Sequence, residues 1–260
     1  MLILGTTQAA VADAVRRDDA KTRQMFTRAR KVEEKYAASL KQIARHVGEI
    51  IKGFPIGDPA VLPELNATLS RYSELIRPWA RHIASRIVSE VNRYDEQAWE
   101  HHARQMSSAI RAELRTTNVG RVTRELQEEQ IVLIQSIPIV AAERVHKLTY
   151  EGLASSQRAS EIVKEILASG DVSKSHAELI AVTEVARATT SFTRARAEQI
   201  GSTHYIWETV RDKRVRQRHR ELQGEVIAWD SPPVAGSKGE RAHAGAIYRC
   251  RCWPRPLLRH

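Results

Sequence analysis

Two apolar stripes in the first hundred residues constrain the fold most, because each repeats at the spacing of an α-helix. The first stripe steps by three or four residues through Phe26, Ala29, Val32, Tyr36, Leu40, Ile43, Val47 and Ile50. This spacing puts the apolar side chains on one helical face. One long helix is therefore expected from about Gln8 to Ile51, and Gly53, Pro55 and Gly57 should end it.

The second stripe predicts a partner for that helix. It runs through Leu62, Leu65, Leu69, Tyr72, Ile76, Trp79, Ile83, Ile87, Val91 and Tyr94. Asp58 and Pro59 have the residue types of an N-cap followed by a proline in the first turn. Pro78 lies inside the stripe, so a kink or a break is expected there. Two long helices with a short turn predict an antiparallel hairpin, either a docking surface or part of a bundle.

Helical patterns continue as far as Gly201. A third helix is expected over 97–117. Another should resume near Val122, be interrupted at Pro138 and end near Gly152. A short helix over 160–168 should stop at Ser169-Gly170, and the capping-box spacing of Ser175 and Glu178 predicts that the next helix begins at Ser175.

The period changes after Gly201. Strands are expected over 205–210, 225–229 and 247–253, with a short basic helix after the first of them. Strands should be confined to this region. The predicted fold is therefore mainly α: a helical scaffold or docking domain over residues 1–150, followed by a small, basic α+β domain over 151–260.

Positive charge is concentrated at the end of the chain. The formal net charge is +10, and twelve Arg and Lys residues face only five Asp and Glu residues from Arg211 onward. Such a segment favours a polyanionic partner, either nucleic acid or an acidic protein face, although a solvated basic tail has the same composition. No apolar run is long enough for a membrane span, and the first residues lack a signal peptide's basic region. We therefore expect no membrane partner and a role inside a cell or an assembled particle.

The candidate DNA-binding residues are all basic and lie near the predicted short helix. They are spread around it and are not confined to one stripe, which suits phosphate contacts to double-stranded DNA without sequence choice. The Asn and Gln pattern of a base-reading helix is absent. The residues are Arg211, Lys213, Arg214, Arg216, Arg218, Arg220, Arg249 and Arg251.

Both cysteines of the chain lie two residues apart, at Cys250 and Cys252. On a strand the two thiols would face the same side. His219 is the natural third ligand of a structural zinc ion, with Asp212 or His243 as a fourth. Structural zinc sites usually have two to four residues between paired cysteines, and here there is one. The alternative is a packed corner with inert thiols and a hydrogen bond between His219 and Asp212.

An enzyme is the alternative of a different class. Asp212 and His219 are seven residues apart, so on one helix they would share a face, and with a metal they could hydrolyse a phosphodiester. A cysteine beside His219 could also act as a nucleophile. However, the sequence shows neither an Asp/Glu cluster for two metals nor a glycine-rich phosphate loop. We therefore assign no catalytic residue, and a metal-dependent nuclease or toxin-like enzyme stays the second hypothesis.

The order of residues in the last third of the chain resembles the phage Mu F-like minor head proteins, also called the phage head morphogenesis family. The resemblance covers about residues 150–256. Val182 stands where the family usually has arginine, and Ala244-Gly245 stands where it usually has Pro-Gly. The residues that match are Thr183, Glu184, Trp207, Asp212, Arg214, Val215, Arg216, His219, Leu222, Gly224, Cys250, Arg251, Cys252 and Pro254.

This resemblance implies a function. Such a protein would be a minor capsid protein of a tailed phage or prophage and not an enzyme. Its partners would be the portal protein, the major capsid or scaffolding protein, and packaged DNA. It would act in head assembly or genome ejection, located in the capsid interior or at the portal vertex, after a period in the host cytoplasm during assembly.

Overall fold

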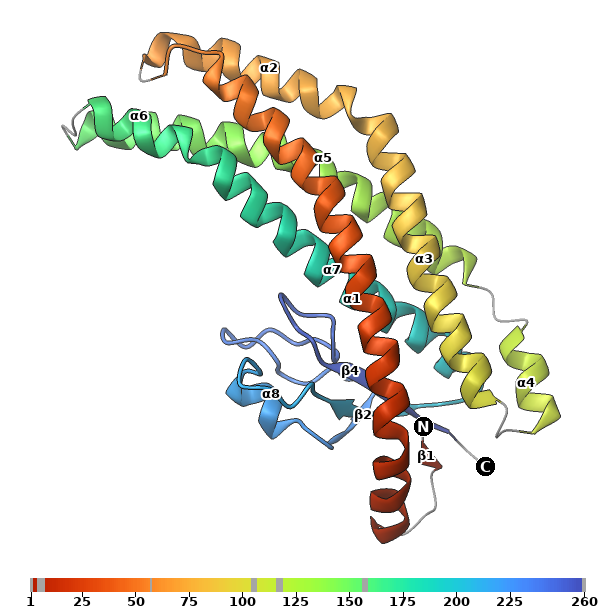
Figure 1. Ribbon diagram of the computed structural model, residues 1–260. Helices are drawn as coiled ribbons and strands as arrows, with labels where there is room; N and C mark the ends of the chain where they lie inside the picture. The colour runs from red at the N-terminus through yellow and green to blue at the C-terminus, as the bar shows by residue number, and fades with distance from the viewer. Residues whose placement is uncertain are drawn as a thin grey trace. The chain divides into compact units, whose positions relative to one another are not determined.

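The computed structural model describes residues 2–3, 8–56, 58–103, 107–115, 119–155 and 159–258, and most of them are helical (Figure 1). This confirms the predicted class, a mainly α chain with a small sheet near its C-terminus. The elements in chain order are β1 (Leu2–Ile3), α1 (Gln8–Lys52), the 3₁₀ turn η1 (Pro59–Val61), α2 (Leu62–Leu75), α3 (Arg77–Ala103), α4 (Ser108–Arg115), α5 (Gly120–Ala154), α6 (Ala159–Leu167), α7 (Ser169–Gln199), β2 (His204–Glu208), α8 (Gln217–Glu221), β3 (Val226–Ala228) and β4 (Trp253–Leu258).

The chain forms two compact units, each assembled from separate stretches of sequence. The helical unit comprises residues 34–86 and 127–181, and the sheet unit comprises residues 1–33, 87–126 and 182–260. Helices α1, α3, α5 and α7 contribute residues to both units. The sequence-based division near residue 150 stays a prediction.

Within the helical unit, the first apolar stripe is buried as its spacing predicts. Tyr36, Leu40 and Val47 are fully buried, and the hydroxyl of Tyr36 donates to Gln130 Oε1 at 2.9 Å. His46 Nδ1 lies 3.0 Å from the hydroxyl of Tyr72, so α1 and α2 pack as the expected hairpin. Among the described residues, no helix carries the long apolar stretch that a bilayer span requires.

Proline has opposite effects at two positions. At Pro78 the chain breaks as expected, because α2 ends at Leu75 and α3 begins at Arg77. At Pro138 the predicted interruption is wrong, since α5 continues through it. A proline lacks the N–H that would bond one turn back. Beside it, Ser73 Oγ donates to the carbonyl of Gln135 at 2.9 Å, so a neighbouring helix supplies a hydrogen bond there.

Two predicted helix starts are also wrong. No boundary occurs at Gln97, because α3 runs on to Ala103, and in the described part of 97–117 a separate helix begins only with α4. The short helix α6 ends at Leu167, ahead of Ser169-Gly170 as expected. The next long helix starts at Ser169 instead of Ser175, and Asp171 in its first turn suits a helix N-terminus.

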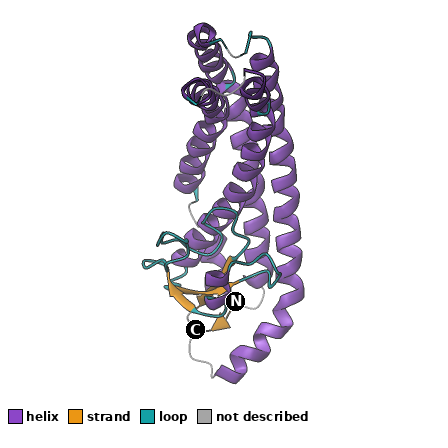
Figure 2. Cartoon of the chain, turned by 90° about the vertical axis from the view of Figure 1, so that its left-hand side faces the viewer, coloured by secondary structure: helices purple, strands orange, loops and turns teal. Residues whose placement is uncertain are grey.

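The sheet has the strand order β1-β4-β2-β3. β2 pairs antiparallel with β3 and with β4, with Trp207 opposite Pro254, while β1 runs parallel to β4. Figure 2 shows the strands together, with β1 from the start of the chain beside β4 near its end. Strands are therefore not confined to the region after Gly201, because the two residues of β1 precede it.

The last strand begins later than predicted, at Trp253 instead of residue 247. The preceding residues form turns, in which Ala246 N donates to His243 O at 3.0 Å and Cys250 N to Ile247 O at 2.9 Å. Gly245 and Arg249 have positive φ angles of 84° and 49°, which extended strands do not adopt. Cys250 therefore lies in a turn, and Cys252 lies immediately before β4.

The core of the sheet unit gathers aromatic side chains beneath the sheet. Tyr205 and Trp207 of β2 are fully buried, and they pack with Trp99 of α3 and Trp229 after β3. Cys250 and Cys252 belong to the same buried cluster. Alternate residues of a β-strand point to the same face, so Tyr205 and Trp207 enter this core together.

Candidate metal centre and basic surface

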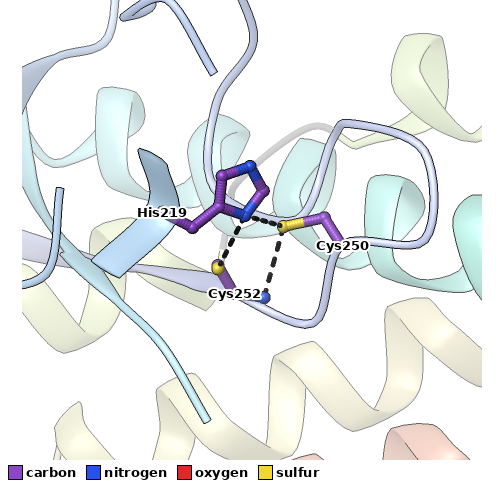
Figure 3. A group of neighbouring side chains, drawn as sticks. All are labelled: His219, Cys250 and Cys252. Carbon is purple, nitrogen blue, oxygen red and sulfur yellow. Dashed lines mark hydrogen bonds between the residues drawn. The ribbon is translucent and has the colours of Figure 1, made fainter. Parts of the chain in front are cut away.

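Three side chains from separate segments meet in the sheet unit. His219 comes from α8, Cys250 from the turn before β4, and Cys252 from the residue that precedes β4 (Figure 3). Nδ1 of His219 lies 3.5 Å from Cys250 Sγ and 3.4 Å from Cys252 Sγ. All three candidate ligand atoms lie within 4.8 Å of one another. The structure thus brings together the three residues that the sequence singled out as metal ligands.

The orientation of the His219 ring is fixed by its other nitrogen. Nε2 lies 3.1 Å from the carbonyl oxygen of Ala235, which can only accept a hydrogen bond. Nε2 must therefore carry the proton in the neutral ring, and the lone pair of Nδ1 faces the two sulfur atoms. The carbonyl is itself held in place, because Ala235 N donates to Glu240 O at 2.9 Å. The ring of Trp207 packs edge-to-face against His219 with centroids 5.4 Å apart.

Burial and mutual contact set the chemistry of the two thiols. Cys250, Cys252 and His219 are only 2%, 4% and 2% exposed. The hydrogen bond from Cys252, with help from His219, lowers the pKa of Cys250 even though burial opposes this. The same contact, together with burial, raises the pKa of Cys252. Without a metal, the pair therefore favours one thiolate and one thiol.

Neither candidate fourth ligand joins this cluster within the described residues. Asp212 is 2.7 Å from the guanidinium of Arg251, whose hydrogen bond lowers the pKa of the carboxyl. Nδ1 of His243 lies 3.2 Å from the hydroxyl of Tyr205. Burial lowers the pKa of His243. The expected hydrogen bond between His219 and Asp212 is not formed, because both ring nitrogens of His219 face other atoms.

The turn that carries Cys250 is held from three sides by residues of the sequence motif. Thr183 Oγ1 on α7 accepts from Arg249 N at 3.1 Å. Arg216 Nη2 donates to the carbonyl of Tyr248 at 2.7 Å, and Arg251 pairs with Asp212. These motif residues therefore act on one short segment, although they come from distant parts of the chain.

The remaining motif residues shape the surrounding frame. Glu184 pairs with Arg187 on the same helix, with 2.6 Å between the charged groups. Gly224 has a φ of 85°, a left-handed conformation that suits glycine, and its N–H donates to Trp207 O at 2.8 Å. Pro254 lies opposite Trp207 in the sheet. The turn at Gly224 and the strand pairing thus place Trp207 next to the cysteines.

Two contributions were missed by sequence reasoning. The first is the carbonyl of Ala235, which no side-chain pattern could reveal. The second is the buried ion pair between Glu208 and Arg255, 2.7 Å apart, in which Gln223 Nε2 also donates to Glu208. A charged residue inside the apolar strand 205–210 was the available signal, since a buried carboxylate requires a partner.

The basic residues separate into two groups. They do not share one helix, because α8 covers only 217–221 and residues 211–216 form a turn. For the same reason, Asp212 and His219 do not lie on one face of a helix, although the sequence predicted that they would. Arg216 and Arg251 hold the cysteine turn, and Arg218 donates to Val234 O and pairs with Glu221.

The other basic residues are available at the surface. Lys213 and Arg220 are exposed and form no ion pair within the described part of the chain. Arg214 is 78% exposed and 3.5 Å from Asp212, while Arg249 is exposed and its guanidinium lies over the ring of Tyr248. Arg211 is exposed too, 3.8 Å from Glu208. The exposed basic charge thus belongs to the turn before α8, to Arg220 on α8 and to the turn before β4.

Comparisons with known proteins agree with the motif. Residues 143–254 match the family model described as "Phage Mu protein F like protein". A protein of Haemophilus influenzae, described as an uncharacterized protein, is 26% identical over 141 residues. That match covers 54% of this chain and 30% of the relative's length, so this chain spans under a third of that protein. No solved structure matches. The motif and the family match together show that residues 143–254 are similar to phage Mu F-like proteins, and they support a protein of that kind.

Proposed function

We propose that this chain is a minor head protein of a tailed phage or prophage that associates with the portal during head assembly. The observation that carries the proposal is the match of residues 143–254 to a phage Mu F-like family, whose members are head morphogenesis proteins. In this chain the motif residues of that segment build one corner around the turn before β4. The major capsid or scaffolding protein is a further partner in this proposal.

Contact with packaged double-stranded DNA is the second part of the proposal. Lys213 and Arg220 are exposed and form no ion pair with the residues that the structure describes, and Arg214 is largely exposed nearby. Such side chains can approach phosphates without breaking internal bonds, and phosphate contacts give binding without sequence choice. This supports a position in the capsid interior or at the portal vertex, and a role in assembly or genome ejection.

The burial of the Cys–His cluster favours a structural role over a catalytic one. A nuclease must bring a phosphodiester to its metal or nucleophile, and the three candidate groups here are at most 4% exposed. Asp212, which a hydrolytic mechanism would require beside His219, is bound to Arg251 instead. The enzyme hypothesis therefore receives no support from the geometry of this cluster.

Co-assembly with the portal tests the proposal. The full chain is coexpressed with the portal protein of the phage or prophage that encodes it, and the mixture is separated by size at low and at roughly 0.5 M salt. At high salt, exposed charges are screened within a few ångströms. We expect a complex of fixed ratio that survives high salt. Portal rings that elute without the chain at both salt concentrations would contradict the association. A complex that forms at low salt and dissociates at high salt would show only a non-specific electrostatic attraction between the two proteins.

A further inference from the structure

We propose that His219, Cys250 and Cys252 bind one Zn²⁺ ion, which ties α8 to the turn and the strand that end the sheet unit. The ligands come from three segments whose packing the ion would fix. This site goes beyond the proposed head function and does not depend on it.

The distances from His219 to the two sulfur atoms fit tetrahedral zinc. Zinc binds thiolate sulfur at about 2.3 Å and imidazole nitrogen at about 2.0–2.1 Å, so at a tetrahedral angle the two atoms are roughly 3.5 Å apart. The observed separations of His219 Nδ1 from the two sulfur atoms are 3.5 and 3.4 Å. An ion can therefore enter between these atoms with little movement of the chain.

The electrostatics of the cluster also favour a divalent cation. Two thiolates and one neutral imidazole neutralise Zn²⁺, and a neutral centre avoids the cost of a buried net charge. A backbone N–H group already faces one sulfur atom, since Cys252 N donates to Cys250 Sγ at 3.4 Å. The buried indole Nε1 of Trp207, whose ring packs against His219, has no hydrogen-bond partner among the described residues. Donors of this kind stabilise thiolates.

The hydrogen bond that would orient a zinc-bound His219 is already in place. Zinc-bound histidines usually donate their other N–H to a carbonyl or carboxylate, which fixes the tautomer and the ring plane. His219 makes this contact through Nε2 with Ala235 O. The hydrogen-bonded turn that holds Ala235 would therefore orient the ligand before the metal arrives.

The fourth coordination position is left to a small exogenous ligand. Within the described residues, no further His, Cys, Asp or Glu places a ligand atom in the cluster. Catalytic zinc sites with three protein ligands hold water in the fourth position, and the same coordination is available to this buried site. We assign this role to a water molecule, because the ligands are too buried for a large group to reach the ion.

Metal analysis of the purified full chain, made without a histidine tag and kept reduced, tests the site. We expect about one zinc per chain after purification in zinc-containing buffer followed by gel filtration. Cys250→Ser, Cys252→Ser and His219→Asn should each lose at least about tenfold in zinc affinity. His204→Asn is the matched control, since His204 lies on β2 outside the cluster, and it should retain full zinc content.

Cobalt substitution provides a readout that does not depend on how the variants fold. Co²⁺ bound to the folded wild-type protein should show intense visible bands of tetrahedral geometry and a thiolate-to-metal charge-transfer band. Removing zinc with a chelator should also lower the melting temperature, because the metal binds the folded state preferentially.

Several results would overturn the site. Folded, reduced wild-type protein with far less than one zinc and no cobalt spectrum would leave only a packed corner of thiols and histidine. Retention of zinc by Cys250→Ser would place the metal elsewhere. Both results would leave the proposed head function standing, because that proposal is tested on portal and virions.

Discussion

Gly245 lies where the cysteine-bearing segment comes closest to α7. Its φ is 84°, and a Cβ there would lie 2.6 Å from Thr190 Oγ1 and 2.9 Å from Cys252 O. Thr190 Oγ1 donates to Ala244 O at 2.6 Å, so helix and turn are joined at this point. The preceding residue is alanine where the family usually has proline, and its N–H donates to the hydroxyl of Tyr205 at 3.4 Å. A proline could not make that bond.

Replacement of Gly245 by alanine should destabilise the protein more than the same change at Gly239. Gly239 has a similar φ of 86° but nothing within 4 Å of the position of a Cβ. Gly239→Ala should therefore lower the free energy of unfolding by about 1 kcal/mol, because alanine disfavours the left-handed backbone conformation. Gly245→Ala adds a steric clash and should lower it by about 2–4 kcal/mol. Denaturant unfolding of both variants measures the difference. Equal costs would show that the turn does not pack closely against α7.

For single residues, the sequence predicted which side chains form the candidate site, but not which partner each of them contacts. Sequence order identified His219, Cys250 and Cys252, because each residue type carries metal chemistry. It placed Asp212 beside His219, whereas Asp212 is bound to Arg251. An aspartate has several arginines within reach along this chain, and only the fold decides which one it meets. The backbone carbonyl of Ala235 has no signal in the sequence.

At the scale of elements, α3 and α7 are tied together inside the sheet unit by a buried ion pair. Arg196 Nη1 lies 2.6 Å from Asp95 Oδ2, and both side chains are at most 5% exposed. Asn92 accepts a second hydrogen bond from Arg196 at 2.8 Å. Burial raises the pKa of Asp95 to about 6, although Arg196 acts in the opposite direction.

This shifted pKa predicts a pH-dependent contribution to stability. The unfolded carboxyl has a pKa near 3.8, so between pH 4 and 6 the folded protein holds more protons than the unfolded one. The contribution of Asp95 to the free energy of unfolding should therefore be largest at low pH, and it should fall as the pH rises through this window. Asp95→Asn removes the titration, and the difference in unfolding free energy between wild type and variant should change by roughly 2–2.5 kcal/mol from pH 4 to pH 7.

The control for this measurement is Glu100→Gln, which changes an exposed carboxylate on the same helix. Urea unfolding of the three proteins at a series of pH values gives the comparison. Glu100→Gln should follow the wild-type curve closely. A difference between wild type and Asp95→Asn that stays constant from pH 4 to pH 7 would mean that Asp95 remains ionised throughout, held by Arg196.

Helices were predicted well where packing follows periodicity and poorly where tertiary contacts intervene. The stripe through Tyr36 and Leu40 is buried as its spacing requires. α5 passes through Pro138, where Ser73 of another helix bonds the carbonyl of Gln135. No local pattern predicts that contact between helices. The last strand was misplaced because Cys250 follows an arginine with a positive φ, which is uncommon outside glycine.

For the molecule as a whole, positive charge is the property that bears on partners. The net charge is +10, and it is concentrated after Arg211. The structure shows that part of this charge is used internally, by Arg216 and Arg251, which hold the cysteine turn. Lys213 and Arg220 stay exposed and unpaired within the described residues, so they are the sharper probes of an external polyanion.

If these two residues contact DNA phosphates, their replacement should reduce the salt dependence of binding. Each duplex phosphate contact contributes about 0.9 to the slope of log affinity against log salt, so Lys213→Gln with Arg220→Gln should lower the slope by up to about 1.8. Binding should weaken equally for all sequences. Filter binding at several salt concentrations measures both effects.

A matched pair with the same loss of charge is Arg121→Gln with Lys147→Gln, at side chains that are 75% and 71% exposed. This control should leave the slope nearly unchanged. Equal slopes for both double variants and wild type would indicate that the turn before α8 faces a protein instead of the genome.

The central claim, that this chain is a phage head protein, is tested most directly by quantitative mass spectrometry of purified particles. Procapsids and virions of the phage or induced prophage that encodes the chain are compared with its portal and major capsid protein as internal references. We predict that the chain is present in procapsids, at an abundance near that of the portal and far below that of the major capsid protein. Its absence from both procapsids and virions, with portal and capsid protein readily detected, would contradict the account.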